Sequence, residues 1–115
     1  MNYKHEDSQE YQYLVKRVSH GDTNAFSTII KNTEGLVTQI VYKMIPNSEG
    51  RKDIAQEVYL KVFQNLKSFR FQSKISTWIA QITYNTCLNF LDKKNLYFPT
   101  LSQILINLMM KHLKY

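Results

Sequence analysis

The sequence predicts an all-α fold, a compact bundle of about four helices followed by a C-terminal apolar helix. Only three glycines and two prolines occur among the 115 residues, whereas sandwiches and barrels need many turn residues. Apolar residues recur at helical spacing in successive segments of the chain. The chain length suits one domain, expected over residues 1–94, with a separate tail over 95–115.

The first two helices are separated by a glycine and an N-capping residue. Residues 11–20 carry apolar side chains at helical spacing, and Gly21-Asp22 then predicts a helix stop followed by an N-cap. A second helix is expected to run up to a turn cluster at 46–50, with Gly35 interrupting or bending it.

The third helix, expected over residues 53–66, has the most regular pattern. Its apolar stripe consists of Ile54, Ala55, Val58, Val62 and Leu66. Leu60 falls on the opposite face, beside Gln56, Glu57 and Gln64. A leucine bordered by a carboxylate and amides on an outward face indicates a surface for a partner.

The stretch "SFRFQSKISTW" at residues 68–78 combines aromatic and cationic side chains without an acid. Aromatic rings beside cations can stack unpaired bases and attract phosphates. Phe69 and Phe71, together with Lys67, Arg70 and Lys74, have this composition. The alternative is that Phe69 and Trp78 anchor the loop to the core and only Phe71 is free.

A fourth helix is expected over residues 76–92, with Ser76 or Thr77 as its N-cap. Its core-facing side chains are Trp78, Ile79, Ile82, Thr86 and Phe90. The opposite strip holds Gln81, Asn85, Asn89 and Asp92, with Tyr84 and Leu88 alongside. Amide side chains offer both a donor and an acceptor to a base edge. The alternative interpretation of this strip is a solvated polar face.

The composition argues against an enzyme and against a cofactor. The three histidines, His5, His20 and His112, lack metal-ligand spacing, and no glycine-rich phosphate loop occurs. The single cysteine, Cys87, is expected in the core and fits a reducing cytoplasm. No apolar run is long enough for a membrane span. The formal net charge of +6 suits a polyanionic partner.

The segment "DIAQEVYLKVFQNLKSFRFQSKISTWIAQITYNTCLNFL" resembles region 2 of the sigma-70 family, in its extracytoplasmic-function group. The resemblance extends back through "LVKRVSHGDTNAF" and covers about residues 10–94. It implies a compact helical bundle in the cytoplasm. It also implies binding to core RNA polymerase, and recognition and opening of the −10 promoter element in transcription initiation.

The resemblance assigns two groups of site residues. The contact with the polymerase clamp is carried over to Asp53, Gln56, Glu57 and Leu60. A loop at 69–76 is expected to hold a flipped base of the non-template strand, and 78–92 is the recognition helix. The DNA-binding residues are then Phe69, Arg70, Phe71, Lys74, Ser76, Trp78, Gln81, Asn85 and Asn89. No catalytic or metal-binding residue is implied.

Three departures from the family support an alternative. The recognition helix carries Gln81, Tyr84 and Asp92 where this group commonly has arginines, and the reader of the −35 element is not recognised in the sequence. The tail 95–115 matches nothing in the family. The alternative function is a truncated sigma-like module that occupies the polymerase clamp, or binds an anti-sigma factor, without initiating transcription.

The tail has an apolar pattern of its own, formed by Leu101, Ile104, Leu105 and Leu108. An apolar stripe left in water is costly, so it must be covered. Pairing with a second copy of the chain, as a homodimer through residues 96–113, is expected in preference to packing back on the bundle.

Overall fold

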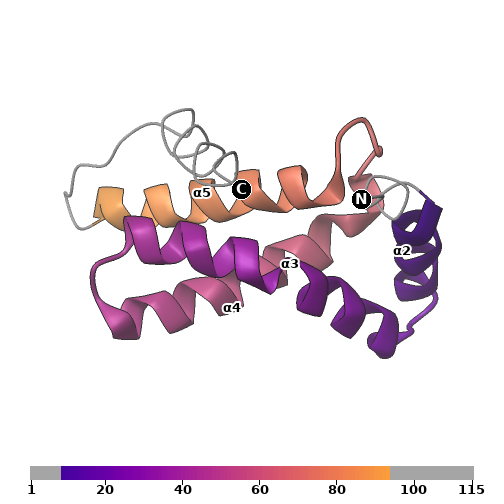
Figure 1. Cartoon of the computed structure of the whole chain (residues 1–115), viewed down its shortest axis with the longest axis horizontal. Helices are drawn as coiled ribbons and strands as arrows, with labels where there is room; N and C mark the ends of the chain where they lie inside the picture. The colour runs from indigo at the N-terminus through magenta and orange to yellow at the C-terminus, as the bar shows by residue number, and fades with distance from the viewer. Residues whose placement is uncertain (1–8, 94–115) are drawn as a thin grey trace, which may run out of the picture.

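The computed structural model of the chain describes residues 9–93, which are helical throughout apart from short connections (Figure 1). The elements are α2 (Tyr11–Ser19), α3 (Thr23–Met44), α4 (Ser48–Asn65), the short 3₁₀ helix η2 (Leu66–Ser68) and α5 (Ile75–Lys93). The predicted all-α fold is confirmed. The helix expected in the tail and the pairing through residues 96–113 lie outside the described residues.

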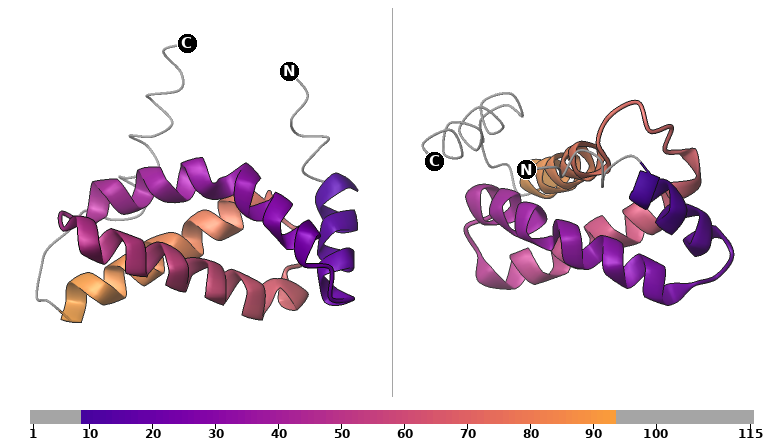
Figure 2. Two further views of the ribbon diagram at one scale, coloured as in Figure 1. Left: turned by 90° about the horizontal axis from the view of Figure 1, so that it is seen from below. Right: turned by 45° about the vertical axis from the view of Figure 1, so that its right-hand side comes forward.

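The three long helices α3, α4 and α5 pack against one another, and α2 stands across one end of this bundle (Figures 1 and 2). The most extensive contact joins α3 to α5, and α4 packs against both. The short helix α2 contacts α3 and η2. The packing of these helices therefore sets the positions of the outward side of α4 and of the loop before α5.

One hydrophobic core joins all of these elements. Fully buried side chains come from α3, α4 and α5, among them Ile40, Val58 and Ile79. In α4 the predicted stripe is buried at Ile54, Val58, Val62 and, just beyond the helix end, Leu66. Because the stripe faces inward, the opposite side of α4 is fixed toward solvent.

The predicted boundary between α2 and α3 is confirmed. Gly21 has φ of +92°, a conformation that glycine adopts without a side-chain clash. The Asp22 carboxylate accepts hydrogen bonds from the backbone amides of Asn24 at 3.0 Å and Ala25 at 3.2 Å. Arg17 also donates to Asp22 at 2.9 Å, which ties the end of α2 to the start of α3.

Three local expectations differ from the structure. Of the two expectations for Gly35, an interruption or a bend, the interruption is wrong, because α3 is one helix of 22 residues. The turn cluster is shorter than expected, because the Asn47 side chain accepts from the amide of Glu49 at 2.8 Å and caps a helix that begins at Ser48. Ser76 and Thr77 lie inside the first turn of α5, which begins at Ile75, and so neither is its N-cap.

Candidate functional site

The outward face of α4 gathers four of the predicted site residues. Asp53, Gln56, Glu57 and Leu60 are all exposed, and their spacing places them on one side of the helix. The Leu60 side chain is 56% exposed. This surface, called here the α4 face, presents an apolar side chain one helical turn beyond a carboxylate and an amide.

Lys61 connects the α4 face to α5. Its ammonium lies 3.3 Å from the Glu57 carboxylate and donates a hydrogen bond to the Thr86 hydroxyl at 3.2 Å. Thr86 donates its own proton to the carbonyl of Ile82 at 2.7 Å. Sequence analysis did not single out Lys61, because its contact with α5 spans 25 positions.

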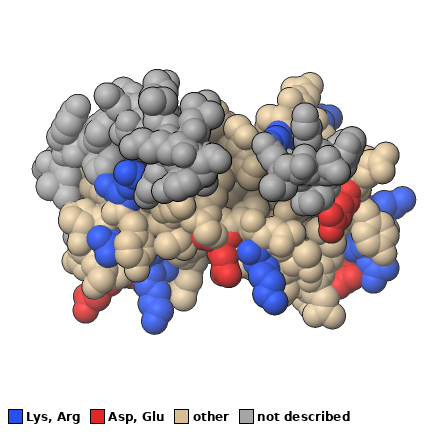
Figure 3. Space-filling view, in the orientation of Figure 1, with Lys and Arg blue, Asp and Glu red and all other residues tan. Residues whose placement is uncertain are grey.

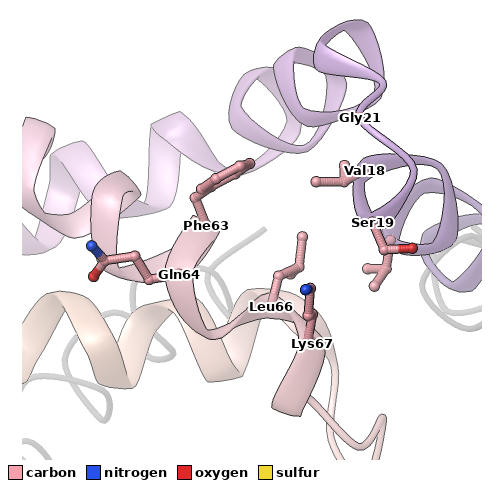
Figure 4. Close-up of a pocket in the computed structure, with 8 residues that line it drawn as sticks. Val18, Ser19, Gly21, Phe63, Gln64, Leu66 and Lys67 are labelled. Atoms are coloured by element: carbon pink, nitrogen blue, oxygen red, sulfur yellow. The ribbon is translucent and has the colours of Figure 1, made fainter.

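An apolar groove lies beyond the α4 face, between the C-terminal turn of α4 and α2. Figure 4 shows Phe63 and Leu66 facing Val18 across it. The groove has a volume of about 410 Å³, and it is also lined by Gln64 of α4 and Lys67 of η2. Phe63 is 52% exposed and makes an edge-to-face contact with Phe26, with ring centroids 5.2 Å apart.

The aromatic residues of the loop form one row of three rings. Phe69 is 9% exposed and occupies the middle, with its centroid 4.5 Å from Phe71 and 4.9 Å from Trp78. Phe69 and Trp78 thus anchor the loop, as the alternative interpretation expected. Phe71, however, is not free, because its ring is partly buried against Phe69.

A small cavity opens beside this row. It has a volume of about 190 Å³, and its walls are Ser68, Phe69, Arg70, Gln72, Ser73 and Trp78. Three of the predicted DNA-binding residues, Phe69, Arg70 and Trp78, are therefore brought together around one cavity. Phe71 and the exposed Lys74 do not line it. Sequence analysis missed Ser68, Gln72 and Ser73, since polar loop residues have no periodicity.

The amide strip of α5 is exposed at Gln81, Asn85 and Asn89. Ser76, which lies in the first turn of α5, is partly exposed. Tyr84 was expected beside the strip, but only 9% of its surface is exposed and it belongs to the core. The amides of α5 are therefore exposed without the Tyr84 ring beside them.

The segment that contains the loop and α5 is basic, but its charged side chains do not form one concentrated patch. No aspartate or glutamate occurs between residues 58 and 91. On the face seen in Figure 3, lysines and arginines are scattered among a few carboxylates and do not form one large patch. The cations around the loop are Lys67, Arg70 and Lys74, and all three are exposed.

The described residues contain no group of three or more histidine, cysteine, aspartate or glutamate side chains that could hold a metal. Cys87 is fully buried, and burial raises the pKa of its thiol to about 12, which identifies it as a core residue. Among residues 9–93, no helix is long and apolar enough to cross a membrane.

This all-helical frame, with an outward α4 face and an aromatic loop cavity, agrees with a family of transcription proteins. Residues 29–96 match the model of the family described as sigma-70 region 2, and the chain belongs to this family. The chain resembles ECF RNA polymerase sigma factor SigW of Bacillus subtilis, with 34% identity over 80 residues. It is 35% identical over 80 residues to the ECF RNA polymerase sigma-E factor of Escherichia coli K12. These relatives indicate the ECF group.

Both alignments cover 70% of this chain, but only 43% and 41% of the two relatives. The chain thus spans less than half the length of the curated relatives it matches. A solved structure, an engineered region 2 of sigmaE in complex with GTAAAA, is 34% identical and superposes with a TM-score of 0.65. That match covers 73% of this chain and 87% of the solved chain.

Proposed function

We propose that the chain acts as region 2 of an ECF sigma factor in transcription initiation, in the cytoplasm. In this proposal the α4 face binds the clamp of core RNA polymerase. The loop cavity and α5 recognise and open the −10 promoter element. The observation that carries the proposal is the joint exposure of Asp53, Gln56, Glu57 and Leu60 on one side of α4 in a member of this family.

The chemistry of the α4 face suits a protein partner. An exposed leucine gains free energy when a partner buries it, and carboxylates beside it favour a partner with cationic side chains. Lys61 holds the Glu57 side chain toward α5 and so restricts its position before binding. A restricted side chain loses less conformational entropy when the complex forms.

The loop cavity suits an unstacked base. Its aromatic walls, Phe69 and Trp78, offer ring surface for stacking, and Arg70 can attract the adjoining phosphate. Gln72 and the two serines offer donors and acceptors to a base edge. The related region 2 of sigmaE was solved with the oligonucleotide GTAAAA. We infer that single-stranded −10 DNA is the ligand class of this chain, with Gln81, Asn85 and Asn89 near the duplex edge.

One observation favours the second candidate function. Helix α5 has no lysine or arginine from Ile75 to Asp92, so its outer side can neutralise few phosphates. A chain with this helix could occupy the polymerase clamp, or bind an anti-sigma factor, and contribute little to DNA binding. Both candidates require the α4 face, and they differ in whether transcription starts.

Co-purification with core RNA polymerase tests the shared part of both functions. Glu57→Lys reverses a charge at the centre of the α4 face, and we expect it to abolish co-purification while helical circular dichroism stays intact. Asp92→Lys is the matched control, because it makes the same change at an exposed site on α5. Normal co-purification of Glu57→Lys would reject the α4 face as the polymerase contact.

We also propose that residues 95–115 form a separate tail that pairs two copies of the chain through 96–113. The support is the apolar pattern of Leu101, Ile104, Leu105 and Leu108 in the sequence. Analytical ultracentrifugation should then detect a concentration-dependent dimer, and truncation after Asn95 should remove it. A monomer at high concentration would reject the pairing and favour packing on the bundle.

A further inference from the structure

Phe71 has an unusual backbone conformation. Its φ is +59°, and no other non-glycine residue among those described has φ in this left-handed range. This region is unfavourable for an L-residue, and for a bulky side chain it persists only when surrounding contacts hold it. Phe71 must therefore make contacts that compensate for the strain.

The compensating contact is with Phe69. The two ring centroids lie 4.5 Å apart at an interplanar angle of 54°, and Phe71 is partly buried. Phe69 contacts Trp78 in turn, at 4.9 Å between centroids. Phe71 thus supports the central ring of the row, and the central ring is a wall of the loop cavity.

Phe71 is not one of the residues that line the loop cavity. Arg70 and Gln72, its two neighbours in sequence, both line the cavity, while Phe71 does not. The φ of +59° at residue 71 accounts for this arrangement, since the phenyl ring contacts Phe69 while the two flanking residues line the cavity. The phenyl ring of Phe71 thus contacts a wall of the cavity, Phe69, and does not itself line the cavity.

We propose that Phe71 is a positioning residue for the loop cavity. It holds the Phe69 ring in the orientation that stacks a base, and it makes no contact with the base itself. This differs from the expectation that Phe71 is itself one of the DNA-binding residues. The proposal rests on the proposed function, because it requires that the cavity binds single-stranded DNA.

The test compares two variants of Phe71. Both lose the phenyl ring, but only one of them also relieves the backbone strain at residue 71. Phe71→Ala removes the ring and keeps the backbone cost, whereas Phe71→Gly removes the ring and relieves the cost. Both should bind the single-stranded hexamer GTAAAA about five- to tenfold more weakly, a fraction of the stacking contribution of one base. Phe71→Tyr keeps the ring and should bind as the native chain does. Phe26→Ala, which removes another partly buried ring far along the sequence, should leave the affinity unchanged.

Two further readouts separate positioning from contact and from general stability. Trp78 is the only tryptophan, so its fluorescence quenching at saturating hexamer reports stacking in the cavity, and Phe71→Ala should reduce the quenching amplitude. The dependence of affinity on salt should stay unchanged in Phe71→Ala, since no cation is lost. Arg70→Ala should reduce that dependence by about 0.7 in the logarithmic slope.

The outcomes distinguish the two proposals. Native affinity in Phe71→Ala, or recovery of affinity and quenching in Phe71→Gly, would overturn the positioning role and leave the proposed function standing. Failure of the native chain to bind the hexamer, both alone and with core RNA polymerase, would overturn the DNA-binding function itself and the positioning role with it.

Discussion

Replacing Leu60 with alanine should weaken binding to core RNA polymerase without lowering the stability of the bundle. Leu60 is 56% exposed, so about half of its surface remains for a partner to bury. Burial of a whole leucine side chain contributes about 1.5–3 kcal/mol, and the exposed 56% therefore about 0.8–1.7 kcal/mol. This loss corresponds to about a four- to sixteenfold increase in Kd.

Leu66 provides a matched control on the same segment of the chain. It is only 3% exposed and belongs to the core. Leucine-to-alanine changes at buried sites cost about 2–5 kcal/mol of unfolding free energy. In a domain of this size that loss lowers Tm by about 8 °C or more. Leu66→Ala should thus be unstable yet bind polymerase normally at a temperature where it is folded.

The assay is a titration of fluorescently labelled chain with core RNA polymerase, combined with thermal unfolding followed by circular dichroism. We expect that Leu60→Ala changes Kd alone and that Leu66→Ala changes Tm alone. An unchanged Kd in Leu60→Ala, or a fall of several degrees in its Tm, would refute the assignment of Leu60 to the interface.

Three other predictions concern the frame that holds the site. Tyr59→Phe removes a hydroxyl that lies 2.8 Å from the Thr33 hydroxyl of α3, and it should lower the unfolding free energy measured in urea by about 1 kcal/mol. The hydrogen bond from Arg17, followed by that from the Ala25 amide, lowers the pKa of Asp22 below its ordinary 3.8. The stability that Asp22 contributes is therefore fully present above that value and lost as the pH falls through the lowered pKa. Asp22→Asn should lack this acid-side loss in thermal melts. Burial raises the pKa of the Cys87 thiol to about 12. The thiol should therefore resist an aromatic disulfide reagent at pH 8 until the chain unfolds. Rapid labelling of the folded chain would contradict the burial of Cys87.

Periodicity in the sequence was sufficient to predict the core side of α4 and hence its outward face. Val58 and Val62 recur at helical spacing and are fully buried, and Leu60, which falls between them, is exposed. A local pattern can predict this because burial and exposure in a helix follow its 3.6-residue repeat. The Gly21-Asp22 cap was predictable for the same reason, since capping depends on neighbouring residues.

Features that depend on contacts distant in sequence could not be predicted. Gly50 lies inside α4, where a Cβ atom would sit 3.2 Å from the Phe90 ring of α5. Sequence analysis interpreted this glycine as part of a turn, because the close approach of Phe90 leaves no trace in the local pattern. The role of Lys61 was hidden likewise, since Thr86 lies on another helix.

The loop could be predicted in composition but not in geometry. The aromatic and cationic residues of "SFRFQSKISTW" indicated a nucleic-acid surface, and Phe69, Arg70 and Trp78 do line one cavity. Which ring faces the cavity depends on the backbone at Phe71, and a φ of +59° at a phenylalanine is not expected from local preferences. The amides of α5 were correctly expected on its outer side, whereas Tyr84 is held in the core.

Run-off transcription with core RNA polymerase tests whether the chain starts transcription as region 2 of a sigma factor. The template should carry an unpaired −10 region, so that the reaction depends on polymerase binding and on capture of the non-template strand. We expect a transcript that requires the chain and disappears with Glu57→Lys. Absence of the transcript, while the native chain still co-purifies with polymerase, would contradict the sigma function and leave the clamp-occupying module as the better account.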